Sequence, residues 1–191
     1  MSPTFRALRV RNFRLYALGG VISNTGTWMQ RVAQDWLVLQ LFATSAAGAS
    51  TALGVTTGLQ FLPILLLSPY AGVVADLMPK RRLLIMTQLW MGASSLLLGA
   101  LALLGSLQPW LVFSLVFVFG IGAAFDAPAR QAFVSEMVAG DDLSNAVGLN
   151  SASFNLARLV GPAAAGLLIA VLGGGVVASG VVILLNGLSY V

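Results

Sequence analysis

The chain contains no cysteine and no histidine, and charged residues make up only 8% of its 191 residues. The absence of cysteine excludes disulfides, thiolate nucleophiles and thiolate zinc sites. The absence of histidine excludes catalytic triads in which an imidazole is the base. We therefore expect no enzymatic activity, no cofactor and no metal site. No removable signal peptide is recognised at the start of the sequence either.

What the chain has in abundance is apolar sequence, at 58% of all residues and a mean hydropathy of +0.92. Apolar runs of about 18 residues or more predict membrane-spanning helices. We predict six such helices, at residues 14–41, 48–75, 83–104, 110–128, 147–172 and 176–191. The short connections favour antiparallel neighbours in one bundle. The predicted fold is an all-α membrane protein, with an N-terminal segment of residues 1–13 and a six-helix transmembrane domain of residues 14–191.

The few charges outside the predicted spans gather on one side of the membrane. They precede the first helix or lie in the second and fourth connections: Arg6, Arg9, Arg11 and Arg14; Lys80, Arg81 and Arg82; Arg130, Glu136, Asp141 and Asp142. The other three connections, "FATSAAGAS", "GSLQP" and "GGG", carry no charge. The positive-inside rule makes the charged side cytoplasmic, with both termini there, in a multi-pass protein of the inner (plasma) membrane. This pattern reflects topology rather than a nucleic-acid-binding face, so no nucleic-acid partner is expected. Asp141 and Asp142 are interpreted as N-terminal caps of the fifth helix.

The second connection contains more than topology requires. In "GVVADLMPKRRLLI", residues 72–85, Gly72 allows close helix packing and Asp76 is suited to accept hydrogen bonds or to pair with an arginine. In the fifth helix, "ARLVGPAAAG" at residues 157–166 surrounds Pro162 with small residues, including Gly161 and Gly166. Proline removes one backbone hydrogen bond and can bend the helix, and small residues let another helix approach.

These two stretches resemble signatures of the major facilitator superfamily. The first resembles its loop between helices 2 and 3, with Leu77 and Pro79 replacing the usual basic residue and glycine; the second resembles its antiporter motif. Together with "NFRLYALGGVISNTGTWMQRVAQDWLV" and "PARQAFVSEMV", they place the closest resemblance in the branch of the enterobactin exporter and the transmembrane secretion effectors.

The resemblance implies one half of a twelve-helix transporter, made of two inverted three-helix repeats. Pro63 and Pro162 are equivalent under such a repeat, as are the pairs Arg31/Asp35 and Asp126/Arg130. It also implies secondary active, proton-coupled efflux of a small molecule: a drug, a siderophore or a metabolite. The implied partners are the lipid bilayer, the substrate, protons, and a C-terminal half or a second copy. Gly72, Asp76, Lys80 and Arg81 would latch the two halves. The alternative is a truncated half transporter, or a six-helix permease subunit, without transport activity of its own.

Ionisable residues at membrane depth are functional candidates because they are costly there. In the first helix, Arg31 and Asp35 are one turn apart and are expected to pair. They either face a central cavity, where Asp35 takes a proton or touches substrate, or form a self-satisfied pair near the outer interface. Asn24 and Gln30 extend the polar face of this helix, and Gln60 of the second helix lines the cavity or makes an interhelical hydrogen bond.

Arg158 stands inside the fifth helix near Asn155, so it must face protein or water. It either binds an anionic substrate or pairs with Asp35 or Asp126. Asp126 and Arg130, four residues apart, are expected to join Asp76 in a charge network that responds to conformation; a simple pair at the helix end is the alternative.

Overall fold

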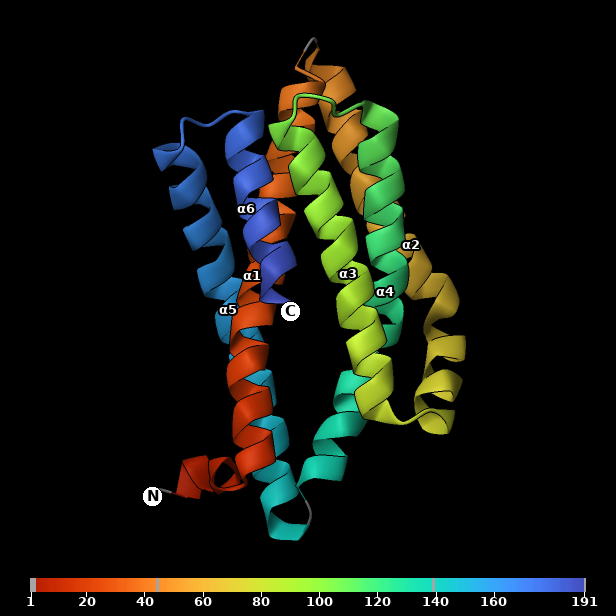
Figure 1. The fold of residues 1–191 in the computed structure, drawn as a ribbon, viewed down its shortest axis with the longest axis vertical. Helices are drawn as coiled ribbons and strands as arrows, with labels where there is room; N and C mark the ends of the chain where they lie inside the picture. Colours follow the sequence, from red (N-terminus) through yellow and green to blue (C-terminus); the bar gives the residue numbers. More distant parts are fainter. Residues whose placement is uncertain (1–2, 44, 139, 191) are drawn as a thin grey trace.

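The structure is a computed structural model that describes residues 3–190 except 44 and 139. Its elements run alternately up and down in one bundle (Figure 1). The helices are α1 (Arg11–Leu41), α2 (Ala46–Leu77), α3 (Lys80–Leu103), α4 (Pro109–Met137), α5 (Leu143–Val171) and α6 (Val176–Ser189), with short 3₁₀ segments η1 (Pro3–Arg9) and η2 (Gly140–Asp142). The six-helix, all-α fold predicted from the hydropathy pattern is confirmed.

Four helices, α2 to α5, are long and apolar enough to cross a membrane. Helix α1 has 31 residues but a polar face, whereas α6 is apolar but has only 14 residues. At 1.5 Å per residue α6 is about 21 Å long, less than the roughly 30 Å of a hydrocarbon core. The C-terminal end therefore lies near mid-height in Figure 1 rather than at the end that carries the N-terminus. The placement of both termini on the cytoplasmic side stays a prediction.

Two of the predicted charged connections are largely helical. Lys80, Arg81 and Arg82 form the first turn of α3, so only Met78 and Pro79 separate α2 from α3. Helix α4 continues past Pro128 to Met137 and contains both Arg130 and Glu136. The prediction ended this helix at Pro128, but neighbouring helices can compensate for the single backbone hydrogen bond that a proline removes.

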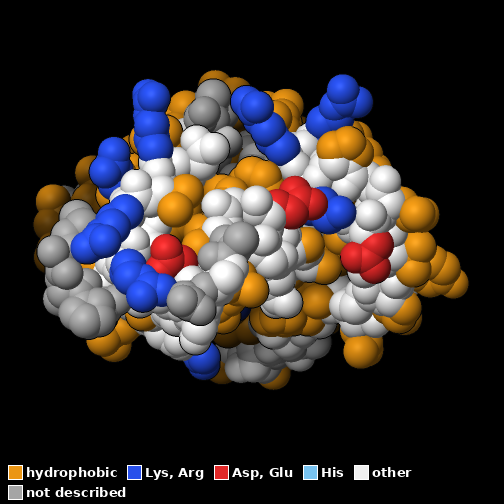
Figure 2. Space-filling model, turned by 90° about the horizontal axis from the view of Figure 1, so that it is seen from below, with side chains coloured by type: hydrophobic (Ala, Val, Ile, Leu, Met, Phe, Trp, Pro, Cys, Tyr) orange, Lys and Arg blue, Asp and Glu red, His pale blue; other side chains and the backbone are white. Residues whose placement is uncertain are grey.

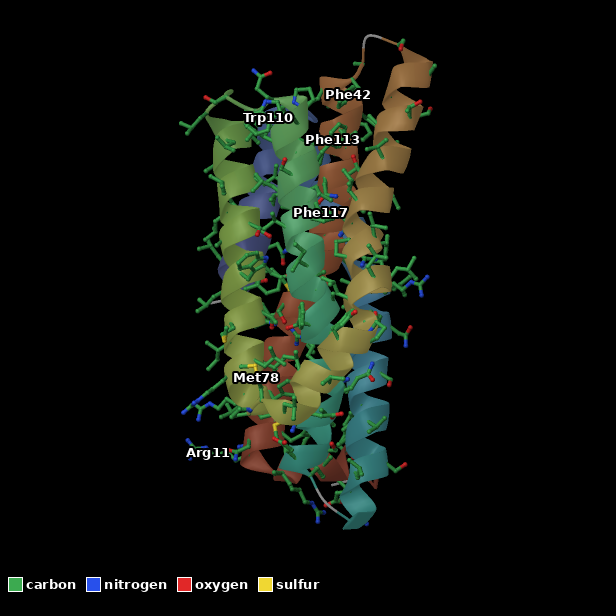
Figure 3. The ribbon with its side chains drawn as sticks, turned by 90° about the vertical axis from the view of Figure 1, so that its right-hand side faces the viewer. Arg11, Phe42, Met78, Trp110, Phe113 and Phe117 are labelled. Atoms are coloured by element: carbon green, nitrogen blue, oxygen red, sulfur yellow. The ribbon has the colours of Figure 1, made fainter. Side chains whose placement is uncertain are left out.

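The two ends of the bundle differ in chemistry. Figure 2 views the end that carries the N-terminus, and Lys and Arg side chains project around its edge. Figure 3 shows Arg11 and Met78 toward this end, and Trp110, Phe42 and Phe113 toward the other. The rings of Phe42 and Phe113 stack with centroids 5.8 Å apart. Cations gathered at one end are the arrangement that the positive-inside rule expects of a membrane-spanning bundle.

The helices pack as an internal repeat. The main contacts join α1 to α5, α2 to α4, α3 to α6, α1 to α6, and α3 to α4. Exchanging α1–α3 for α4–α6 turns the α1–α5 pair into the α2–α4 pair, and the α1–α6 pair into the α3–α4 pair. The α3–α6 pair maps onto itself. This is the arrangement that two related three-helix units produce.

Glycines allow the closest of these crossings. A Cβ atom on Gly161 of α5 would lie 2.6 Å from the Cβ of Trp28 on α1, and one on Gly120 of α4 would lie 2.5 Å from the carbonyl oxygen of Gln60 on α2. At the α3–α6 crossing, a Cβ on Gly99 would lie 2.9 Å from the carbonyl oxygen of Gly180. Small residues let membrane helices approach backbone to backbone, so van der Waals contact replaces the hydrophobic driving force.

Candidate functional site: a polar cavity inside the bundle

A cavity of about 650 Å³ opens between α1, α2, α3, α4 and α5. Its lining includes six residues that the sequence singled out: Asn24, Arg31, Gln60, Asp126, Arg130 and Asn155. Three other candidates, Gln30, Asp35 and Arg158, do not line it. The structure therefore brings together about two thirds of the predicted polar positions around one space, from helices distant in sequence.

On the α3–α4 side of the cavity, Asp126 is the centre of a charged cluster. Its carboxylate accepts hydrogen bonds from Thr87 Oγ1 and Gln88 Nε2, each at 2.9 Å, and forms an ion pair with Arg130. Only 6% of Asp126 is exposed. Both carboxylate oxygens thus have partners, as a buried charge requires. The predicted pairing of Asp126 with Arg130 is present.

Asp76 does not join this cluster. Among the described residues the ion pairs are Arg6–Asp142, Lys80–Glu136 and Arg130–Asp126. Asp76 is exposed near the end of α2, and its backbone carbonyl accepts a hydrogen bond from Lys80 Nζ at 3.3 Å. The expected network of Asp76 with Asp126 and Arg130 is therefore wrong in this conformation, because the cluster is completed from α3 instead.

On the α1–α6 side a neutral cluster takes the corresponding place. Asn186 Nδ2 donates to Gln30 Oε1 at 2.6 Å and to Tyr190 Oη at 3.4 Å, and Tyr190 Oη bonds Thr27 Oγ1 at 2.6 Å. Gln30, Asn186 and Tyr190 are all buried. Gln30 is thus an interhelical hydrogen-bonding residue in this structure rather than part of the cavity wall.

Arg31 and Asp35 do not form the expected pair: within the described chain, no carboxylate lies within ion-pair distance of Arg31. The guanidinium of Arg31 instead lies over the ring of Trp28, 4.3 Å from its centroid, and 5.1 Å from the centroid of Phe61. Its Nε is buried without a hydrogen-bond partner. Contact with the aromatic faces replaces the ion pair.

Arg158 also lies over the ring of Trp28, with its guanidinium 5.5 Å from the ring centroid. In the described residues it pairs with neither Asp35 nor Asp126. The pairing alternative for Arg158 is therefore wrong. The sequence reasoning missed Trp28 and Phe61; the spacing of Trp28 three residues before Arg31 was the available signal, since such residues share a helix face.

The helix-5 stretch and the α2–α3 connection differ in how they pack. Gly161 makes the close contact with α1 that the sequence suggested, and Pro162 lies inside the continuous helix α5. Gly166 and Gly72 have open space where a Cβ would stand. A Cβ on Gly72 would therefore meet no other helix of the described chain, which leaves that side of the residue open.

The N-terminal segment is fastened to the start of α5. Arg6 forms an ion pair with Asp142, and the backbone N–H of Ala7 donates to Asn145 Oδ1 at 2.9 Å. Asp142 occupies the N-cap position of α5 without a side-chain capping bond, so its expected role as a cap is wrong: its carboxylate is engaged by Arg6. The side chain of Asp141 lies outside the described residues.

Comparison with known proteins yields consistent matches. The family described as "Transmembrane secretion effector" matches residues 2–191. The staphyloferrin A transporter of Staphylococcus aureus is 31% identical over 150 residues, 76% of this chain and 36% of that protein. The multidrug efflux pump Tap of Mycolicibacterium fortuitum is 32% identical over 165 residues (84% and 39%). Macrolide efflux protein A of Streptococcus pyogenes is 27% identical over 135 residues (71% and 33%). The matched part of the chain thus spans 33–39% of the length of these relatives, which are transporters rather than enzymes.

Proposed function

The chain belongs to the transmembrane secretion effector family of the major facilitator superfamily, and on that premise we propose that its six helices form the N-terminal half of a proton-coupled exporter of small molecules. The observation that carries the proposal is the polar cavity of about 650 Å³ within a mostly apolar bundle. Polar groups at membrane depth are costly, and they mark transport pathways. The efflux functions named for two of the relatives support export.

The second wall of the pathway comes from a further six helices. In alternating access, two six-helix halves rock against each other around a site near the bilayer midplane. The relatives are between two and three times as long as the matched part of this chain, which leaves room for such a second half. If that half is missing, a second copy of this chain supplies the wall.

Within the cavity, the neutral polar side chains of Asn24, Gln60 and Asn155 hydrogen-bond the substrate, and Arg31 lies at its edge. Gln30 holds α1 to α6 beside them. Asp126 is the proton carrier, because it is the carboxylate that lines the cavity. Its protonation removes the charge that holds Arg130, which frees that guanidinium to move. Asp35, which lies outside the cavity lining, is the less suitable carrier.

The start of α3 and the end of α2 act as the latch on the cytoplasmic face. Lys80 is held by Glu136 of α4 at 3.3 Å, so the beginning of α3 is tied to the end of α4. Asp76 and Arg81 are exposed beside it, and Gly72 is open to close approach. These groups are free to contact the second half in one of the two states. The cytoplasmic placement follows from the basic residues at this end.

The test is a proton-linked transport assay in everted membrane vesicles. The chain is produced together with any coding sequence that follows Val191, and the loss of an imposed pH gradient is recorded as candidate substrates are added. Asp126→Asn is expected to reduce substrate-dependent proton movement about 10- to 100-fold, the usual range of a coupling free energy. Asp35→Asn, which changes a carboxylate outside the cavity, is the matched control and leaves the rate unchanged.

Two results count against the proposal. If Asp126→Asn retains full coupling at equal protein amount, Asp126 is not the proton carrier. If no candidate substrate moves protons with the continued chain present, the alternative of a half transporter without its own activity is favoured.

A further inference from the structure

Trp28 holds two guanidinium groups against its ring, one from α1 and one from α5. Arg31 lies 4.3 Å and Arg158 lies 5.5 Å from the ring centroid. Phe61 of α2 lies 5.1 Å from the Arg31 guanidinium, and Phe154 of α5 meets Trp28 edge-on with centroids 5.9 Å apart. We refer to these five residues as the arginine–tryptophan cluster. Three helices contribute to it, so the cluster is fixed by the fold of the bundle.

The two arginines of the cluster have no ion-pair partner in the described part of the chain, and Asp35, one turn further along α1, attracts Arg31 only from beyond ion-pair distance. Among the described residues, none of the three ion pairs includes Arg31 or Arg158. The Nε of Arg31 is buried and has no hydrogen-bond partner. Both arginines lie near the middle of their helices, where an uncompensated cation is unfavourable. The aromatic faces compensate only part of that charge. An anionic ligand at this cluster would supply the ion pair and the hydrogen-bond acceptor that the two arginines lack in the described chain.

The cluster is connected to the cavity. Arg31 and Phe154 both belong to the cavity lining, and Arg158 stands one helical turn after Phe154 on α5. The volume of about 650 Å³ lies within the range of roughly 300–1,000 Å³ that is usual for small-molecule sites. A ligand in the cavity can therefore place one end against the two arginines while its body remains among the polar and aromatic side chains.

We propose that the arginine–tryptophan cluster binds the acidic group of the transported molecule, which makes the substrate an organic anion with a flat or apolar body. This inference rests on the proposed transport function. Guanidinium groups bind carboxylates through paired hydrogen bonds, and the indole and phenyl rings pack against the adjoining flat or apolar part. An ammonium ligand of the same shape is repelled, because it adds a third positive charge beside two guanidinium groups that have no ion-pair partner among the described residues.

The test measures binding in the absence of any gradient. The chain, produced with any coding sequence that follows Val191, is purified in phosphatidylcholine nanodiscs and titrated calorimetrically with three probes. These are 1-naphthoate, which has a ring and a carboxylate; 1-naphthylmethylammonium, which has the same ring and a cation; and citrate, which has carboxylates and no ring. We expect 1-naphthoate to bind most tightly, and about tenfold or more tighter than the ammonium probe.

Variants separate the cluster from general surface charge. Arg31→Gln and Arg158→Gln are each expected to weaken 1-naphthoate binding by about tenfold, the effect of losing a charged hydrogen-bonding partner. Arg82→Gln removes the same charge from an exposed site in the first turn of α3 and leaves binding unchanged. Arg158 is also exposed, so its replacement preserves the fold even if Arg31→Gln does not.

Three outcomes overturn the inference. The first is equal binding of the ammonium probe and 1-naphthoate. The second is an effect of Arg158→Gln no larger than that of Arg82→Gln. The third is loss of 1-naphthoate binding when phosphatidylglycerol replaces part of the lipid, since a lipid phosphate then occupies the cluster.

Failure of the transport function gives a different result. In that case 1-naphthoate binds with the expected arginine dependence, while no proton-linked movement occurs in vesicles. If proton-linked transport occurs but anions are not preferred, the proposed transport function stands and the proposed anion-binding site is wrong.

Discussion

The α1–α6 and α3–α4 interfaces both join the two three-helix units and are equivalent when the units are exchanged, yet different chemical groups hold them together. The α1–α6 interface contains the neutral groups of Gln30, Asn186 and Tyr190. The α3–α4 interface contains the charge of Asp126, held by Thr87 and by Arg130 of its own helix. Both interfaces contain buried polar side chains, but of the two only the α3–α4 interface contains a buried ion pair.

The difference concerns how each interface depends on protonation. Amide and hydroxyl groups keep the same hydrogen-bonding capacity at any physiological pH, so the hydrogen bonds of the α1–α6 interface do not depend on a titrating group. A carboxylate that gains a proton loses its ion pair and becomes a donor. Under the proposed function the α3–α4 interface is the one that responds to a proton, and it lines the cavity through Asp126 and Arg130.

The largest expected effect follows from removing one member of the charged cluster. Arg130→Ala leaves the carboxylate of Asp126 buried without its cation, and we expect a loss of about 3–5 kcal/mol in the free energy of unfolding. The double variant Asp126→Leu/Arg130→Leu removes both charges and should recover most of that loss. Unfolding in mixed detergent micelles measures both. Equal stability of the single and double variants would show that the two charges are not coupled.

The next effect concerns the equivalent helix crossings of α1–α5 and α2–α4. Gly161→Ala and Gly120→Ala each place a methyl group within 3 Å of the neighbouring helix, and each is expected to destabilise the bundle by about 1–3 kcal/mol. Gly166→Ala, on the same helix as Gly161 but with open space around it, is the control and should be neutral. A neutral Gly120→Ala beside a destabilising Gly161→Ala would mean that the two crossings are not equivalent.

A smaller effect is expected from the neutral cluster. Asn186→Ala leaves Gln30 Oε1 without its donor, and hydrogen bonds between membrane helices are worth about 0.6–2 kcal/mol. We expect a loss of about 1 kcal/mol in the free energy of unfolding, measured as for Arg130→Ala. A loss as large as that of Arg130→Ala would erase the distinction between neutral and charged interfaces.

The smallest effect is expected at the edge of the charged side, where Lys80 meets Glu136. The Glu136 side chain is 51% exposed, and exposed pairs contribute about 0–1 kcal/mol. Lys80→Ala should therefore change the free energy of unfolding by less than about 1 kcal/mol, and added salt should reduce even that difference. A loss insensitive to salt would assign Lys80 to the interior cluster.

The helices were predictable because hydropathy and length carry most of the signal in a membrane protein. The six elements and their order follow from apolar runs separated by charge or glycine. The ends were less predictable: α4 passes through Pro128, since a single missing backbone bond does not end a packed membrane helix. The start of α6 at Val176 was predictable, because glycines at 173–175 separate it from α5 and two of them have positive φ.

The membership of the candidate site was largely predictable, and so was the pairing of Asp126 with Arg130, but the other pairings were not. Asn24, Gln60 and Asn155 line the cavity because polar residues in membrane helices turn toward protein interiors. The partner of Arg31 was not predictable, because sequence spacing favoured Asp35 on the same helix, while the fold brings Phe61 from α2 and Arg158 from α5 to the same place. Contacts between helices depend on rotation and crossing, which periodicity alone does not give.

The bond between Arg6 and Asp142 joins residues 136 positions apart in the chain. At a synthesis rate of about 5–20 residues per second, Asp142 emerges from the ribosome roughly 7 to 27 s after Arg6. During that interval the N-terminal segment cannot form this contact. Only after the start of α5 has been synthesised can the N-terminal segment close against it, so this contact forms later than the synthesis of the first four helices.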